Sequence, residues 1–104
     1  MKKIGFIGAY DKTDLILYVA KILTVLKKKI LIIDSTVNQK ARYIVPTINP
    51  VVKYVTNFED IDIAVGFSHM EDIKKYLSIA DEQEMEYDIV LIDTENSEGF
   101  NNFE

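Results

Sequence analysis

A lysine and a threonine near the start of the chain have the residue types of a phosphate-binding loop. The segment from Gly8 reads GAYDKTD, and it joins one apolar run to another. Phosphate-binding loops lie where a strand ends in glycine and continues through a Lys-Thr pair into a helix. Gly8, Lys12 and Thr13 are therefore candidate nucleotide-binding residues. The glycine that normally precedes the lysine is absent, because Asp11 stands in its place.

Two aspartates follow apolar runs later in the chain, where strands are expected to end. Asp34 follows ILII, and Asp93 follows IVLI. In open α/β sheets, ligands bind at the carboxyl ends of the strands. A phosphate loop, together with carboxylates that hold Mg²⁺ or its waters, is the minimum apparatus for nucleotide hydrolysis. Asp34 and Asp93 are thus candidate residues for that chemistry.

Three segments predict strands, and the last two are continuous β-branched apolar runs, as a parallel sheet covered on both faces requires. The three segments are Lys3–Gly8, Ile30–Ile33 and Ile89–Ile92. Residues 14–27 give the strongest helix pattern, and the polar positions of that helix form only a narrow stripe. Such a helix needs cover over most of its circumference, from the sheet and from a neighbour.

The middle and the end of the chain carry weaker patterns. Ile61–Phe67 alternates in character, which predicts a half-covered strand with Phe67 on its apolar face. Ser68 begins a capping-box sequence that opens a helix through about Ala80. The other expected segments are a loop or short helix at residues 35–50, a brief strand at Val51–Val55 and a frayed end at SEGFNNFE.

The order of these elements predicts one α/β domain over residues 1–104, a three-layer sandwich with a mostly parallel sheet. The composition is that of a globular chain, with 48% hydrophobic and 28% charged residues. The absence of cysteine excludes disulfides and thiolate metal sites, and the single histidine excludes a His-cluster metal site. No stretch of sequence is long and apolar enough for a membrane span, so we expect a cytoplasmic protein of bacterial type.

The charges are unevenly distributed along the chain, which carries a net charge of −5 at pH 7. Residues 1–29 hold seven lysines and two aspartates, whereas residues 54–104 hold fourteen acidic residues and two lysines. The acidic half argues against a direct nucleic-acid partner. The run of three lysines that ends at Lys29 is better explained as the end of a helix, where cations interact favourably with the helix dipole.

The loop and the two strand ends resemble the ParA/MinD-type ATPases, the deviant Walker A group of P-loop NTPases. The resemblance extends from Lys3 to about Thr94. Lys12-Thr13 falls where that family has its phosphate lysine and magnesium hydroxyl. KKKILIIDST is similar to the family's second strand with its aspartate, and YDIVLIDTEN is similar to the Walker B strand.

The resemblance implies a P-loop NTPase fold and ATP or ADP with Mg²⁺ as the cofactor. Gly8 and Lys12 would bind the phosphates. Thr13 and Asp93 would hold the magnesium ion, and Asp34 would orient the attacking water as the catalytic residue.

This chain departs from the family's loop, which reads lysine-Gly-Gly-any-Gly-Lys-Thr. Ile7 replaces the first lysine, which in the family reaches the partner subunit's nucleotide, and two of the three glycines are absent. Asp11 is the departure with the largest expected effect on nucleotide binding, because its carboxylate would repel the phosphates. Two like charges ~4 Å apart repel by about 1 kcal/mol in water and about 4 kcal/mol at an effective dielectric of 20. As a cap, the same carboxylate can accept free N–H groups of the helix, which stabilises by about 1 kcal/mol. We therefore expect Asp11 to occupy the anion site and efficient ATP hydrolysis to be absent.

Other interpretations of these residues remain open. Lys12 is also explained as a solvated residue near a helix start, and Asp34 and Asp93 as turn caps at strand ends. ILIIDST and YDIVLID also resemble the first and third strands of a receiver domain, in which an aspartate accepts phosphate. Against a receiver, Asp34 lacks the acidic pair expected after the first such strand, and a strand and a helix precede it.

The family domain continues through further strands and helices beyond the Walker B strand. We expect this chain to be its N-terminal half, within a larger protein or as a shortened relative that completes itself by association. Exposed apolar surface and sheet edges are usually covered by partners, so a homodimer or another protein partner is expected. The predicted function is a degenerate ParA/MinD-like module that acts through protein–protein interaction or positioning in a bacterial envelope, secretion, pilus or division system. An active or weakly ATP-binding ATPase is the alternative.

Overall fold

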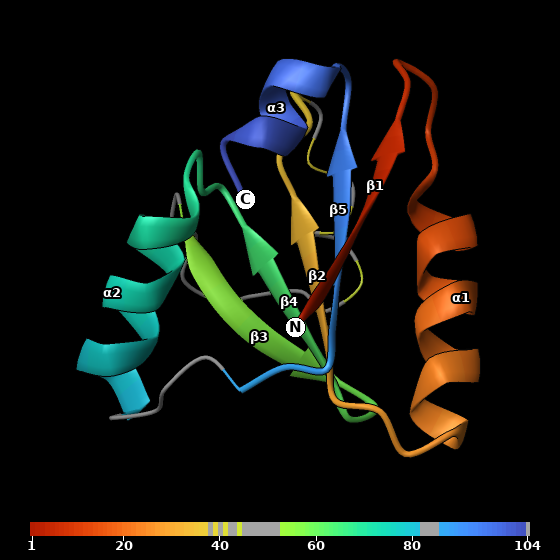
Figure 1. The fold of residues 1–104 in the computed structure, drawn as a ribbon, viewed down its shortest axis with the longest axis vertical. Helices are drawn as coiled ribbons and strands as arrows, with labels where there is room; N and C mark the ends of the chain where they lie inside the picture. The colour runs from red at the N-terminus through yellow and green to blue at the C-terminus, as the bar shows by residue number, and fades with distance from the viewer. Residues whose placement is uncertain (38, 40, 42–43, 45–52, 82–85, 104) are drawn as a thin grey trace.

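The computed structural model describes residues 1–37, 39, 41, 44, 53–81 and 86–103, and Figure 1 shows their fold. This part of the chain contains five strands and three helices. The strands are β1 (Lys2–Ile7), β2 (Ile30–Asp34), β3 (Tyr54–Phe58), β4 (Ile61–Val65) and β5 (Ile89–Thr94). The helices are α1 (Thr13–Val25), α2 (Met70–Asp81) and α3 (Ser97–Asn101). Along the chain their order is β1-α1-β2-β3-β4-α2-β5-α3.

The strands form one sheet in the order β1-β5-β2-β4-β3. The first four of these are parallel to one another, and β3 is antiparallel to β4 at the edge. Helix α1 packs on one face of the sheet, whereas α2 and α3 cover the other (Figure 1). The predicted α/β class with a mostly parallel sheet is therefore confirmed.

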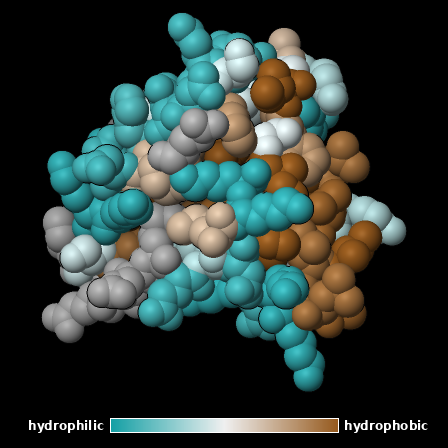
Figure 2. Space-filling model, viewed as in Figure 1, coloured by the Kyte–Doolittle hydropathy of each residue, from teal (hydrophilic) through white to brown (hydrophobic). Residues whose placement is uncertain are grey.

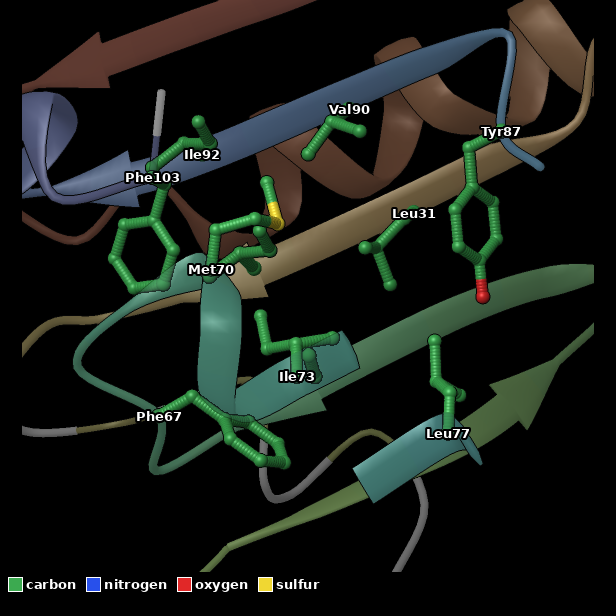
Figure 3. Packing of buried hydrophobic residues seen from close by; sticks show 11 residues of the cluster. Leu31, Phe67, Met70, Ile73, Leu77, Tyr87, Val90, Ile92 and Phe103 are labelled. Atoms are coloured by element: carbon green, nitrogen blue, oxygen red, sulfur yellow. The ribbon is translucent and has the colours of Figure 1, made fainter. Parts of the chain in front are cut away.

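A separate apolar core lies on each face of the sheet. Ile16 and Ala20 of α1 pack over the inward side chains of the central strands on one face. On the other face, Figure 3 shows Ile73 and Leu77 of α2 facing the strand residues, with Phe103 at one end of the cluster. All five residues of β2 are buried, because this strand is central and covered on both sides.

The strand predicted at Ile61–Phe67 is confirmed over Ile61–Val65, but the prediction that it is half-covered and includes Phe67 is wrong. Strand β4 ends at Val65, and Ala64 on its second face is fully buried in the cluster beneath α2. Gly66 has a φ of 87°, so the chain turns there, and Phe67 packs into that same cluster. The predicted strand at Val51–Val55 lies partly outside the described residues; the observed strand β3 begins at Tyr54. Most of the segment 35–50 is also outside them.

The prediction of a frayed end at SEGFNNFE is also wrong. Asn96 caps α3, because its side chain accepts a hydrogen bond of 2.8 Å from the Gly99 N–H. The ring of Phe100 lies so close over Gly5 that a Cβ there would be 2.6 Å from it. Phe103 is fully buried. The last described residues therefore form part of the core, although SEGFNNFE has little apolar periodicity.

No helix within the described ranges has the length and apolar character needed to cross a lipid bilayer.

Candidate functional site

The loop between β1 and α1 lies at the carboxyl end of β1, beside the end of β5. The Gly8 N–H donates to the Thr94 carbonyl at 3.0 Å, which continues the β1–β5 pairing into the loop. Gly8 has a φ of 156°, and a Cβ at this position would lie 2.5 Å from the Tyr10 ring. Glycine is favoured here because other residues rarely adopt this φ, and the Tyr10 ring, which folds back over the start of the loop, would have to move to admit a Cβ.

The side chain of Lys12 is buried and has its charge partner inside the chain. Its Nζ lies 2.9 Å from Oδ1 of Asp93, and it donates to the backbone carbonyls of Gly8 and Tyr10. The Tyr10 ring adds a cation–π contact, with Nζ 5.1 Å from the ring centroid. The interpretation of Lys12 as a solvated residue is therefore wrong, because its side chain is buried and its ammonium is bonded to groups of the protein.

Asp11 lies at the start of α1 with an exposed side chain. Its Oδ1 accepts the Thr13 N–H at 3.0 Å, so the carboxylate satisfies one of the free donors of the helix. The N-cap residue of α1 is Lys12, which makes no side-chain capping bond, so this single contact supports the predicted capping role of Asp11 only in part. That Asp11 occupies an anion site stays a prediction. Thr13, the first residue of α1, is partly buried beside it.

Asp93 is buried at the end of β5. Burial raises the pKa of its carboxyl above the ordinary value of 3.8, and the nearby carboxylates of Asp34 and Asp11 raise it further. Lys12 opposes these effects, since its ammonium favours the ionised form. The two residues meet because β1, which delivers the loop, is the hydrogen-bonded neighbour of β5.

Asp34 is the register partner of Asp93 on β2, but its oxygens are used locally. Oδ1 accepts the Thr36 N–H at 3.0 Å and the Thr36 hydroxyl at 2.6 Å, and Oδ2 accepts the Ala41 N–H at 3.0 Å. Asp34 is almost completely buried. These contacts support its interpretation as a turn cap, while its role in orienting a water stays a prediction.

A cleft of about 130 Å³ lies above these strand ends. It brings together four of the five predicted site residues, and Asp34 is not among those that line it. Its lining residues are Gly8, Ala9, Tyr10, Asp11, Lys12, Thr13, Thr36, Asp93 and Glu95. Ligand pockets are usually about 300–1,000 Å³, so the cleft is small for a nucleotide in this conformation.

Sequence reasoning missed Tyr10, Thr36 and Glu95 as residues of the cleft. Thr36 and Glu95 each stand two residues after a strand-end aspartate, and this spacing was the available signal. Glu95 also connects the two strand ends, because its Oε1 accepts the Val37 N–H at 2.9 Å. Nothing in the sequence pattern indicated that the Tyr10 ring would fold toward Gly8.

The residues of the cleft offer few ligands for magnesium, the ion that the resemblance implies. Within the described residues there is no group of three or more acidic or histidine side chains arranged to hold a metal. Asp93, the predicted ligand, has the Lys12 ammonium at its Oδ1. A magnesium ion at the same oxygen would be repelled by that cation, so the residues do not fit a magnesium site in this arrangement.

The electrostatic character of the cleft is mixed. One buried cation, Lys12, lines the cleft together with three acidic residues, Asp11, Asp93 and Glu95, and of these Asp93 is its ion-pair partner. Comparison of the chain with protein-family models, with curated proteins and with solved structures finds no match.

Proposed function

We propose that this protein is a degenerate module of the ParA/MinD type that acts by binding another protein chain, in positioning or assembly, rather than by hydrolysing nucleotide. A bacterial envelope, secretion, pilus or division system is the proposed setting, as the resemblance implies. The α/β sheet provides the scaffold, and the loop after β1 is held by contacts within the chain.

The observation that carries this proposal is the position of the Lys12 ammonium. A lysine that binds phosphate must present its charge to the ligand. Here the charge is balanced by Asp93 at 2.9 Å, and the ammonium donates to two loop carbonyls. A nucleotide would have to displace this buried ion pair before it gained the lysine.

Two further contacts support a loop that works without nucleotide. Asp11 places a carboxylate at the N-terminal end of α1, where a phosphate would otherwise accept the helix N–H groups. The Tyr10 ring lies over Gly8 and beside the Lys12 ammonium, in the space above the loop. Both side chains would have to move for an anion to enter.

The alternative, a weak nucleotide-binding ATPase, is favoured by a different observation. Gly8, Lys12, Thr13 and Asp93 line one cleft at the carboxyl ends of β1 and β5. This grouping is what a phosphate site of the P-loop type requires. Under this alternative, the ion pair of Lys12 and Asp93 is the resting state of the loop, and nucleotide opens it.

Calorimetry and thermal unfolding with millimolar Mg-ATP and Mg-ADP separate the two functions. We expect no binding heat and no change in Tm. A ligand at 100 times its dissociation constant would stabilise the fold by about 2.7 kcal/mol, which raises Tm by roughly 10–20 °C for a domain of this size. Binding of either nucleotide to the wild-type protein would contradict the proposal and favour the ATPase.

Three variants identify the site if binding occurs. Lys12→Ala should abolish binding, and Asp11→Gly should strengthen it, because the repelling carboxylate is removed. Lys28→Ala is the matched control, because it also removes a lysine, but one that is exposed and lies outside the cleft. Equal affinity in all three variants would place the nucleotide somewhere other than this loop.

A further inference from the structure

A row of large apolar side chains on α1 faces away from the sheet. Its members are between 48% and 80% exposed. We call it the α1 row, and it consists of Leu15, Tyr18, Ile22 and Val25 of α1 and of Leu26, the C-cap residue that follows the helix. Figure 2 shows hydrophobic residues gathered on the side of the molecule where α1 lies in Figure 1, while hydrophilic residues dominate the rest of that view. Apolar patches of this kind usually mark interaction sites.

The spacing of the α1 row is that of a helix–helix seam. Leu15, Tyr18, Ile22 and Val25 are separated by three, four and three residues, which is the spacing of the apolar positions in a coiled coil. The inner face of α1, with Ile16 and Ala20, is already buried against the sheet. The α1 row therefore forms a second apolar face on the same helix.

Charges of opposite sign lie at the two ends of the α1 row. Asp11 and Asp14 are exposed at its beginning, and Lys27 and Lys28 are exposed beyond its end. The lysine at its middle is turned away: Nζ of Lys21 lies 3.2 Å from Glu59. That ammonium also lies 5.4 Å from the Phe58 ring centroid, over the sheet edge of its own chain. The middle of the row is thus left without an unbalanced charge.

We infer that the α1 row binds the α1 row of a second copy of this chain, with the two helices antiparallel across a two-fold axis near Ala20. In this arrangement Leu15 lies opposite Val25 of the other copy, and Tyr18 lies opposite Ile22. The acidic beginning of each helix meets the basic end of the other, so the surface is complementary to itself, as a two-fold interface requires. A parallel pairing would instead place like charges together at both ends.

The sheet edge beside this helix is a weaker contact surface. Strand β1 is an edge strand, and it begins with Lys2 and Lys3. Lysines on an edge strand disfavour the addition of a further strand.

Helix α1 is about 20 Å long, so one helix pair buries less than the roughly 1,600 Å² of a standard interface. We therefore expect a dimer that dissociates on dilution in the micromolar range.

This pairing rests on the proposed function, because it identifies the partner chain as a second copy of this protein. Sedimentation velocity from about 1 to about 500 μM tests the pairing. We expect the sedimentation coefficient to rise with concentration toward that of a dimer. Tyr18→Glu should raise the dissociation constant at least about tenfold, because it places a charge in the seam. Val37→Glu is the matched control, since it makes the same kind of change at an exposed apolar residue outside α1. It should leave the dissociation constant unchanged.

Cysteine crosslinking tests the orientation, since the natural chain has no cysteine. A mixture of Leu15→Cys and Val25→Cys chains should form a mixed disulfide under mild oxidation. Leu15→Cys alone should not, because antiparallel helices hold the two copies of that residue roughly 15 Å apart, and a disulfide needs Cα atoms about 4.4–6.8 Å apart. Crosslinking of Leu15→Cys alone would overturn the antiparallel pairing.

The outcomes distinguish this inference from the proposed function. A monomer at every concentration, without a response to nucleotide, would overturn the pairing and leave a different protein as the partner. Binding of Mg-ATP by a protein that also dimerises through α1 would overturn the proposed function and support the pairing.

Discussion

Asp34 and Asp93 are register partners at the ends of the neighbouring parallel strands β2 and β5, yet their carboxylates have different partners. Asp34 accepts hydrogen bonds from the turn that follows its own strand. Asp93 contacts Lys12, which comes from the loop after β1. Two aspartates in equivalent sequence positions therefore stabilise different parts of the fold: Asp34 stabilises a local turn, and Asp93 stabilises the loop between β1 and α1.

Replacing Asp34 tests its role as a turn cap. Asp34→Asn should lower the free energy of unfolding by about 1–3 kcal/mol, because an amide nitrogen cannot accept the buried N–H bond that one carboxylate oxygen now accepts. Urea denaturation measures the change. Asp60→Asn is the control: Asp60 is exposed with a φ of 68°, a conformation that asparagine tolerates. An equal loss in both variants would contradict the capping role.

The ion pair of Lys12 and Asp93 is expected to show strong coupling. Lys12→Met leaves a buried carboxylate without its cation and should destabilise the fold by about 3 kcal/mol. The double variant with Asp93→Asn should lose less than the sum of the two single losses, with a coupling energy of about 1–3 kcal/mol. Lys28→Met, at an exposed lysine, should have little effect. Additive losses in the cycle would mean that the pair is not formed in solution.

The raised pKa of Asp93 makes stability depend on pH. The folded state binds this proton more tightly than the unfolded state does, so the contribution of Asp93 to the free energy of unfolding is greatest at acid pH. It declines as pH rises from the ordinary value of 3.8 through the higher folded-state pKa. The decline is about 1.4 kcal/mol for each unit by which the pKa is raised.

Comparison with Asp93→Asn isolates this titration from that of the other carboxylates. Denaturation of both proteins from about pH 3 to about pH 7 should show the wild type losing stability relative to the variant as pH rises. A relative gain over the same range would mean that the Lys12 ammonium outweighs burial and lowers the pKa.

The final segment of the chain is expected to contribute to stability. Phe103 is fully buried among the residues shown in Figure 3, so Phe103→Ala should cost about 3–5 kcal/mol. Thermal or urea unfolding measures the loss. Asn101→Ala changes an exposed residue of the same segment and should alter stability little. A small effect at Phe103 would restore the expectation of a frayed end.

The secondary structure was largely predictable because it depends on local pattern. The runs ILII and IVLI became the buried strands β2 and β5, and the apolar run after Lys12 became α1. The side of the sheet on which Phe67 packs was not predictable in this way. It depends on the turn at Gly66, whose positive φ alternation alone does not reveal. The burial of Phe103 likewise depends on a distant cluster.

The candidate site divides in the same way. The residue types of Gly8, Lys12, Thr13 and Asp93, and their places at the ends of apolar runs, were properties of the sequence alone. The sequence also placed Asp11 at a helix start, where a carboxylate accepts free N–H groups. Only the tertiary structure decided that the Lys12 ammonium is neutralised by Asp93, because that contact depends on β1 lying next to β5 and on the path of the loop between β1 and α1. Strand order and loop path arise from contacts between residues distant in sequence, and local pattern does not specify them.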